Sequence, residues 1–359
     1  MTRRVLFTAV LAGLCLASAQ TYRDPKSGLE VVEIAPPGAG TSNLYYHFSN
    51  FTADDSNIIF GAAGADGQVQ VYRYEVATGK AHVVTSGAGV AASNACPHPR
   101  NARLVLYPRG RAVEEIDIYT GKVRRIGELP KPSIGGPGQP TFSHDMKSIT
   151  GVRKRDAANW EVGLMDLATG AWLTVASVGF QVGHVQHHPS EPLIFYVWET
   201  GGYAPQRTWV VNADGTANRP FYYTTEKQKW VTPLKEWMTH ESWVTRTGDM
   251  TLIMDKVGIV IADKTGQGKR LLPGNYWHVR ASEDGRYLLA HDFDGNLFLI
   301  ETATDSRRLI ASGLRDTVRA VHAHASFDRS GKRVLFNTGR TRQTVAYIDL
   351  EKAGLLRAR

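Results

Sequence analysis

The fold of this 359-residue chain is decided by a stretch near its end, Phe327-Asp328-Arg329-Ser330-Gly331-Lys332-Arg333-Val334-Leu335-Phe336. An aromatic anchor, Phe327, is followed by a polar turn that contains Gly331, and then by a run rich in strand-forming residues. The same order of anchor, turn and strand recurs along the chain. It therefore marks a structural repeat rather than a single hairpin.

The anchors of this repeat are Phe51, Pro97, Phe142, His187, Trp243, Ala281 and Phe327. Successive anchors are 46, 45, 45, 56, 38 and 46 residues apart. Most units add a second strand that ends in a turn, as in Ile116-Asp117-Ile118-Tyr119-Thr120-Gly121. A period in the forties with several strands per unit is typical of β-propeller blades. The sequence thus predicts an all-β, single-domain, seven-bladed β-propeller.

The last blade is short of a strand, because the chain ends soon after the strand-like run from Val345 to Leu350. The β-rich segment from Leu29 to Ile34 is able to complete that blade and close the ring. An array of two-sheet sandwiches is the alternative architecture.

The N-terminus has the pattern of an export signal. Arg3 and Arg4 precede an apolar stretch from Val5 to Leu16, which is too short to span a bilayer, and Ala17-Ser18-Ala19 offers small residues at a cleavage site. We therefore expect residues 1–19 to form a signal peptide and residues 20–359 to form the propeller. The mature chain is expected to be periplasmic or secreted, with no membrane span.

Cysteine content and charge limit the other classes. Cys15 leaves with the signal peptide, so Cys96 alone cannot form an internal disulfide. The formal charge of +8 falls to +6 without Arg3 and Arg4, which favours an anionic partner, although ordinary solubility charge is the alternative. No nucleic-acid-binding signature is present, so no nucleic-acid partner is expected.

Histidines in the second half form the candidate metal site. His322 and His324 are two residues apart, so in an extended strand both imidazoles would point to one side. His240 and His278 each precede an anchor, at positions equivalent to that pair. Equivalent positions of neighbouring blades face one axis, so these side chains are expected to converge. A lone histidine is more often a surface or satisfied core residue.

Arg207, in Gln206-Arg207-Thr208-Trp209, is a candidate carboxylate-binding residue because its planar guanidinium makes two parallel hydrogen bonds. The alternative is an exposed arginine whose stem lies along Trp209. The sequence contains no serine-hydrolase elbow, zinc-protease helix or phosphate-binding loop in a supporting context.

Taken together, these motifs resemble the oligogalacturonate lyases of polysaccharide lyase family 22. The matching motifs are Gly183-His184-Val185-Gln186, Gln206-Arg207-Thr208-Trp209, His240-Glu241-Ser242-Trp243, His278-Val279-Arg280-Ala281-Ser282 and His322-Ala323-His324. The resemblance implies a seven-bladed propeller that holds a divalent metal, typically manganese, through three histidines and a glutamine.

By motif position, the resemblance assigns the metal ligands to His278, His322 and His324, and the base to His240. It assigns the active-site arginine, which also binds substrate, to Arg207, and a substrate-binding role to His184.

Three features depart from the family. Arg319 stands where the glutamine ligand belongs, and a guanidinium cannot coordinate a metal, so Arg319 is expected to bind the anionic substrate instead. The family's His-Glu-Gly reads Trp198-Glu199-Thr200 here. The family pattern is intracellular, whereas this chain carries an export signal. These departures indicate a divergent member.

The resemblance implies a metal-dependent lyase that cleaves oligogalacturonides, or related oligouronides, by β-elimination. The alternative is a non-catalytic periplasmic propeller that binds a protein or a glycan, like that of the TolB translocation protein. Arg319 favours the alternative, whereas the joint presence of His240, His278, His322 and His324 favours the lyase.

Overall fold

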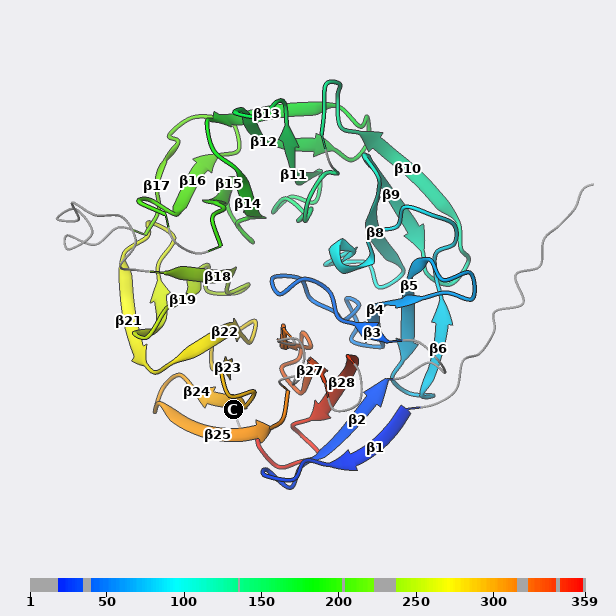
Figure 1. The fold of residues 1–359 in the computed structure, drawn as a ribbon, viewed down its shortest axis with the longest axis vertical. Helices are drawn as coiled ribbons and strands as arrows, with labels where there is room; N and C mark the ends of the chain where they lie inside the picture. The colour runs from blue at the N-terminus through cyan, green and yellow to red at the C-terminus, as the bar shows by residue number, and fades with distance from the viewer. Residues whose placement is uncertain are drawn as a thin grey trace, which may run out of the picture.

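The computed structural model describes residues 19–34, 40–134, 136–201, 204–222, 237–314, 322–339 and 343–357. Seven antiparallel sheets are arranged in a ring around a central axis (Figure 1). The predicted seven-bladed β-propeller is confirmed, and the sandwich array is excluded. No helix in the described part of the chain is long and apolar enough to cross a membrane.

The first three blades run in chain order, each from its innermost strand outward. Blade 1 contains β3 (Thr41–Ser42), β4 (Asn57–Ala63), β5 (Val69–Glu75) and β6 (Lys80–Val83). A short 3-10 helix, η1 (Ala92–Asn94), leads into blade 2, which contains β7 (Cys96–Pro97), β8 (Leu104–Arg109), β9 (Ala112–Asp117) and β10 (Val123–Glu128). Blade 3 contains β11 (Ser148–Lys154), β12 (Trp160–Asp166) and β13 (Trp172–Val178).

The next three blades have four strands each. Blade 4 contains β14 (Val182–His187), β15 (Leu193–Trp198), β16 (Thr208–Asn212) and β17 (Arg219–Pro220). Blade 5 contains β18 (Met238–Trp243), β19 (Met250–Met254), β20 (Gly258–Ala262) and β21 (Gly268–Pro273). Blade 6 contains β22 (Tyr276–Ala281), β23 (Tyr287–Asp292), β24 (Leu297–Glu301) and β25 (Ser306–Ala311).

Blade 7 closes the ring with strands from both ends of the chain. It contains β26 (Ser326–Phe327), β27 (Arg333–Thr338), β28 (Thr344–Asp349), β2 (Glu30–Ile34) and β1 (Ala19–Arg23). β2 pairs with β28, with Val32 opposite Tyr347, as predicted for the segment from Leu29 to Ile34. β1 pairs with the outer side of β2 and makes a fifth strand that the sequence did not predict.

The strand sequences follow from how the blades pack. β15 is apolar at every position and almost fully buried, because both of its faces are covered by neighbouring blades. The outer strand β10 instead exposes Arg124 and Arg125. The core lies between blades; for example, Ile259 of blade 5 belongs to one buried cluster with Val279 and Leu288 of blade 6.

All seven anchors lie on the innermost segment of their blades. Each anchor pairs with a residue seven or eight positions further along: Phe51 with Ile58, Pro97 with Val105, Phe142 with Ile149, His187 with Ile194, Trp243 with Met250, Ala281 with Leu288, and Phe327 with Val334. These innermost segments surround the central channel.

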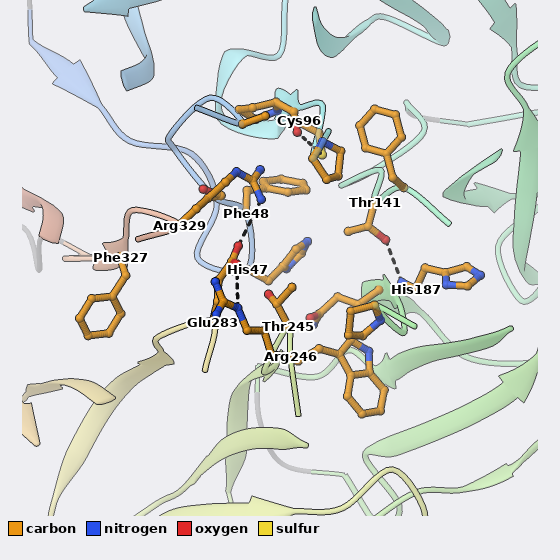
Figure 2. Close-up of a pocket in the computed structure, with 18 of the residues that line it drawn as sticks. His47, Phe48, Cys96, Thr141, His187, Thr245, Arg246, Glu283, Phe327 and Arg329 are labelled. Atoms are coloured by element: carbon orange, nitrogen blue, oxygen red, sulfur yellow. Dashed lines mark hydrogen bonds and ion pairs between the residues drawn. The ribbon is translucent and has the colours of Figure 1, made fainter. Parts of the chain in front are cut away.

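The channel has two chemically different ends. Six of the seven anchors and residues next to them line a cavity of about 500 Å³ at one end (Figure 2). The histidines that lie three residues before the anchors do not line this cavity and lie toward the other end. The loop between β3 and β4 extends to the axis (Figure 1) and brings Tyr45, Tyr46 and His47 into the channel.

Candidate metal centre and active site

Four histidines from three consecutive blades converge in the channel. The candidate ligand atoms of His240, His278, His322 and His324 all lie within 4.8 Å of one another. The sequence predicted that His278, His322 and His324 would meet, and the structure brings them together. It also places His240, which was predicted to be the base, in the same cluster.

Local backbone geometry aims these side chains. His184, His240 and His324 have positive φ angles of 49°, 55° and 39°, a region that non-glycine residues seldom occupy. The pairing of β18 with β19 shifts register between Thr239 and Ser242, around His240. A bulge of this kind turns a side chain out of the regular alternation, so this strain is part of how the site is built.

The reason predicted for the convergence of His322 and His324 is wrong. Both residues lie before β26, outside any strand, so strand alternation does not place them on one side. Instead, the left-handed backbone at His324 turns the chain so that both imidazoles face the channel. His184, His240, His278 and His324 do share a position, since each lies three residues before the anchor of its blade.

The histidine nitrogens are suited to binding a cation. His278 Nε2 lies 3.2 Å from His322 Nδ1, and the buried Nδ1 of His240 has no hydrogen-bond partner among the described residues. Burial lowers the pKa of His324 to about 3, and it lowers the pKa of His240 and His278 well below the ordinary value. Neutral imidazoles present lone pairs, so this set fits a divalent transition metal.

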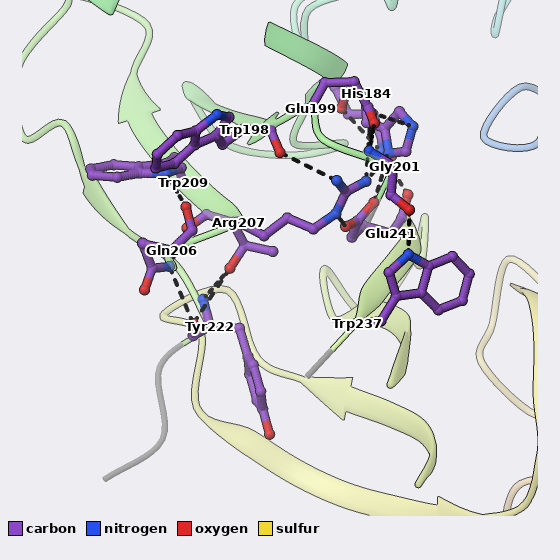
Figure 3. A network of polar contacts seen from close by, with 12 residues as sticks. His184, Trp198, Glu199, Gly201, Gln206, Arg207, Trp209, Tyr222, Trp237 and Glu241 are labelled. Atoms are coloured by element: carbon purple, nitrogen blue, oxygen red, sulfur yellow. Dashed lines mark hydrogen bonds and ion pairs between the residues drawn. The ribbon is translucent and has the colours of Figure 1, made fainter. Parts of the chain in front are cut away.

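A buried polar network lies beside this cluster, with Glu241 at its centre (Figure 3). Arg207 Nε donates to Glu241 Oε1 at 2.9 Å, and His184 Nδ1 lies 2.8 Å from Glu241 Oε2. The side chains of Arg207 and Glu241 are 1% and 0% exposed. Burial raises the pKa of Glu241, but the Arg207 charge and the His184 hydrogen bond outweigh it and lower this pKa well below its usual range.

The burial of Arg207 excludes the exposed alternative. Its guanidinium also donates to the Trp198 carbonyl at 3.2 Å, and its Nη2 lies 3.6 Å from the Glu199 carboxylate. Arg207 thus holds a carboxylate as predicted for its residue type, but the carboxylate is that of Glu241. The substrate-binding role remains a prediction.

His184 belongs to this network and also lines a cavity of about 320 Å³, together with Tyr45 and Glu199. His184 Nε2 lies 3.0 Å from the Tyr45 hydroxyl and 3.3 Å from Glu199 Oε2. Burial and the negative charges of Glu199 and Glu241 raise the pKa of Tyr45, so its phenol stays protonated. A ligand in this cavity would meet a hydroxyl donor, an imidazole and a carboxylate.

Tyr45 and Tyr46 join the network to the histidine cluster. The Tyr46 ring lies 5.2 Å from that of His184 and 5.0 Å from that of His240, and the Tyr45 ring lies 5.3 Å from that of His324. His184 therefore lies next to the histidine cluster, and Arg207 is joined to it through Glu241. Arg319 falls outside the described residues, so its predicted anion-binding role stays a prediction.

Glu241, Tyr45 and Tyr46 were not singled out by the sequence. Glu241 carried a usable signal, because a carboxylate in the inner strand that ends at Trp243 must be buried and therefore paired. Tyr45 and Tyr46 gave no such signal, since the repeat does not show that a loop of blade 1 crosses to blades 4, 5 and 7.

The chain is similar to known proteins in sequence and in fold. A family model described as oligogalacturonate lyase matches residues 13–259. Oligogalacturonide lyase of Pectobacterium atrosepticum is 25% identical over 244 residues, which cover 62% of this chain and 60% of that protein. Oligogalacturonate lyase of Dickeya dadantii is 26% identical over 247 residues, covering 63% and 61%. The matched part thus spans about three fifths of the length of these relatives.

A solved oligogalacturonate lyase in complex with manganese has the same fold, with a TM-score of 0.81 at 19% identity over 94% of this chain and 97% of that chain. The family match includes His184, Arg207 and His240 but ends before His278. The convergence of His278, His322 and His324 is therefore a finding of the structure itself.

Proposed function

Because the chain belongs to the oligogalacturonate lyase family, we propose that it is a metal-dependent lyase that cleaves oligogalacturonides, or related oligouronides, by β-elimination. The observation that carries this proposal is the convergence of four histidines beside the Arg207–Glu241–His184 network. A non-catalytic TolB-like propeller has no need of either feature, so the alternative is not favoured.

The proposed cofactor is a divalent metal, manganese, as in the solved relative. His278, His322 and His324 would hold it. When bound, the ion would withdraw charge from the uronate carboxylate and so acidify the neighbouring C5 proton.

His240 is the proposed base. Its low pKa keeps the imidazole neutral at ordinary pH, and its unpartnered Nδ1 is able to accept the C5 proton. Departure of the C4 oxygen then leaves an unsaturated uronate, and no water is consumed. The Arg207 side chain is 1% exposed and pairs with Glu241. We propose that it fixes Glu241 and His184 and contributes positive charge, beside its predicted role in binding the substrate.

The activity is tested by incubating the purified protein and manganese with a panel of uronide oligomers. Elimination creates a conjugated double bond, which is followed by ultraviolet absorbance. We expect absorbance to rise with oligogalacturonides and to stay flat with neutral oligosaccharides. No rise with any uronide would favour the binding propeller.

His322→Ala/His324→Ala is expected to remove bound metal, because two of the imidazole donors are lost together. Metal content after dialysis against manganese is the measurement, and circular dichroism should show unchanged β-sheet. A matched control, His82→Ala/His144→Ala, removes two histidines outside the cluster and should retain the metal. Equal metal content in the two double variants would contradict the site.

We also propose export, which rests on Arg3, Arg4, the apolar stretch from Val5 to Leu16 and the small residues before Gln20. Residues 1–18 lie outside the described part of the chain. N-terminal sequencing of the protein from its natural host is expected to begin at Gln20 or next to it. An intact Met1 on cytosolic protein would contradict export.

A further inference from the structure

The cavity of about 500 Å³ lies at the end of the channel away from the histidine cluster. In blades 5 and 6 the inner strand places its histidine three residues before the anchor, and the residues that line the cavity come later along the chain. In blade 6, for example, His278 belongs to the histidine cluster, whereas Arg280, Ala281 and Glu283 line the cavity. None of the four clustered histidines lines this cavity.

The cavity carries an excess of positive charge. Four guanidinium groups line it, those of Arg100, Arg246, Arg280 and Arg329. Only Glu283 balances them: its carboxylate lies 3.2 Å from Arg329 Nη1 and 3.8 Å from Arg246 Nε (Figure 2). One carboxylate is thus shared by two cations.

Arg280 and Arg100 form no ion pair with any residue that the structure describes. Arg280 Nη1 donates to the His47 carbonyl at 3.0 Å and to the Ser242 hydroxyl, and Arg100 Nη2 donates to the His144 carbonyl at 3.2 Å. The other acidic side chain of the lining, Asp328, pairs with Arg333 at 3.3 Å and with backbone amides. Arg280 is half-buried and Arg100 is exposed at the rim. Cations without a counter-charge at the wall of a cavity favour an anionic ligand.

The remaining wall combines the rings of Phe48, Phe142, Trp243 and Phe327 with polar side chains such as Gln186. A volume of about 500 Å³ lies within the range of small-molecule sites, which combine apolar walls with a few fixed polar groups. Guanidinium groups bind a planar carboxylate, and aromatic rings pack against the rest of an organic ligand that carries the carboxylate. Inorganic phosphate would use only the first of these features.

We propose that this cavity is a second binding site, for a small organic carboxylate such as a sugar acid, and that it is separate from the metal cluster. The proposal does not rest on the proposed lyase activity. It assigns ligand binding, rather than catalysis, to the end of the channel that lies away from the histidine cluster.

The test is titration calorimetry of the full-length protein with galacturonate as the probe, in wild type and in His322→Ala/His324→Ala. Binding is expected in both, because the cavity does not use the metal histidines. Arg100→Gln/Arg246→Gln removes two exposed guanidiniums from the rim without opening the core. This variant is expected to weaken binding by about tenfold or more, since hydrogen bonds to charged groups are lost.

The matched control is Arg125→Gln/Arg308→Gln, which makes the same charge change on the outer strands β10 and β25. It should bind galacturonate as wild type does. The proposal is overturned if galacturonate shows no saturable binding, if both arginine double variants weaken it equally, or if the His322→Ala/His324→Ala protein no longer binds. Displacement by phosphate at equal concentration would overturn the assignment to an organic carboxylate.

Discussion

His240→Gln is expected to lower the rate of elimination by about two to four orders of magnitude, which is the usual contribution of a positioned general base. The substitution keeps a side chain of similar size in the channel but removes the lone pair of the neutral imidazole. Its buried Nδ1, which has no partner among the described residues, is the atom that accepts the proton in our proposal. The initial rate of absorbance increase at saturating oligogalacturonide measures the effect.

The metal content of the His240→Gln variant distinguishes a catalytic base from a metal ligand at this position. Because His278, His322 and His324 remain, we expect His240→Gln to keep its metal. If metal and activity are lost together, His240 is a ligand in place of the family's glutamine. His98→Gln, which changes a histidine outside the cluster, serves as the control and should be fully active.

Glu241→Gln is expected to lower the free energy of unfolding by about 3–5 kcal/mol, because removing one partner of a buried ion pair leaves an uncompensated charge. The charge left behind is Arg207, whose side chain is 1% exposed. Its other carboxylate neighbour, Glu199, lies at 3.6 Å and forms no hydrogen bond with it, so it replaces Glu241 only in part. Chemical denaturation followed by circular dichroism measures the loss. Glu30→Gln breaks an exposed pair with Lys352 and should have little effect.

The same carboxylate gives a pH dependence whose sign is fixed. The pKa of Glu241 is lower in the folded protein than its ordinary value of 4.5. Its contribution to stability is therefore complete above that ordinary value and is lost as the pH falls toward the folded-state pKa. Wild type should lose stability below about pH 4.5 more steeply than Glu241→Gln; equal slopes would contradict the assignment.

The repeat could be predicted from sequence because each blade contains the same local pattern, which is an anchor residue, a polar turn and a buried strand. The pairing of β2 with β28 followed from the missing strand of the last blade. β1 could not be predicted, because nothing in the repeat requires a fifth strand. The histidine cluster was predicted from repeat-equivalent positions, although the backbone turn at His324, rather than strand alternation, aims that side chain.

What lies in the centre of the ring was harder to predict, since the repeat describes blades and not the channel. Glu241 and Arg207 are far apart in sequence, and their pairing depends on how blade 4 meets blade 5. Tyr46 reaches the same place from blade 1. Contacts between blades that are not neighbours produce no periodic pattern in the sequence, so the repeat does not predict them.

The closure of blade 7 has a consequence for the order of folding. Val32 pairs with Tyr347, so the last sheet joins segments more than 300 residues apart. Bringing such distant segments together costs roughly 5 kcal/mol of chain entropy before any contact forms, and pairings of high contact order are slow. Blade 7 also carries His322 and His324. Two of the four clustered histidines thus belong to the blade that both ends of the chain complete. We expect the gain of metal affinity during refolding to accompany the formation of this blade.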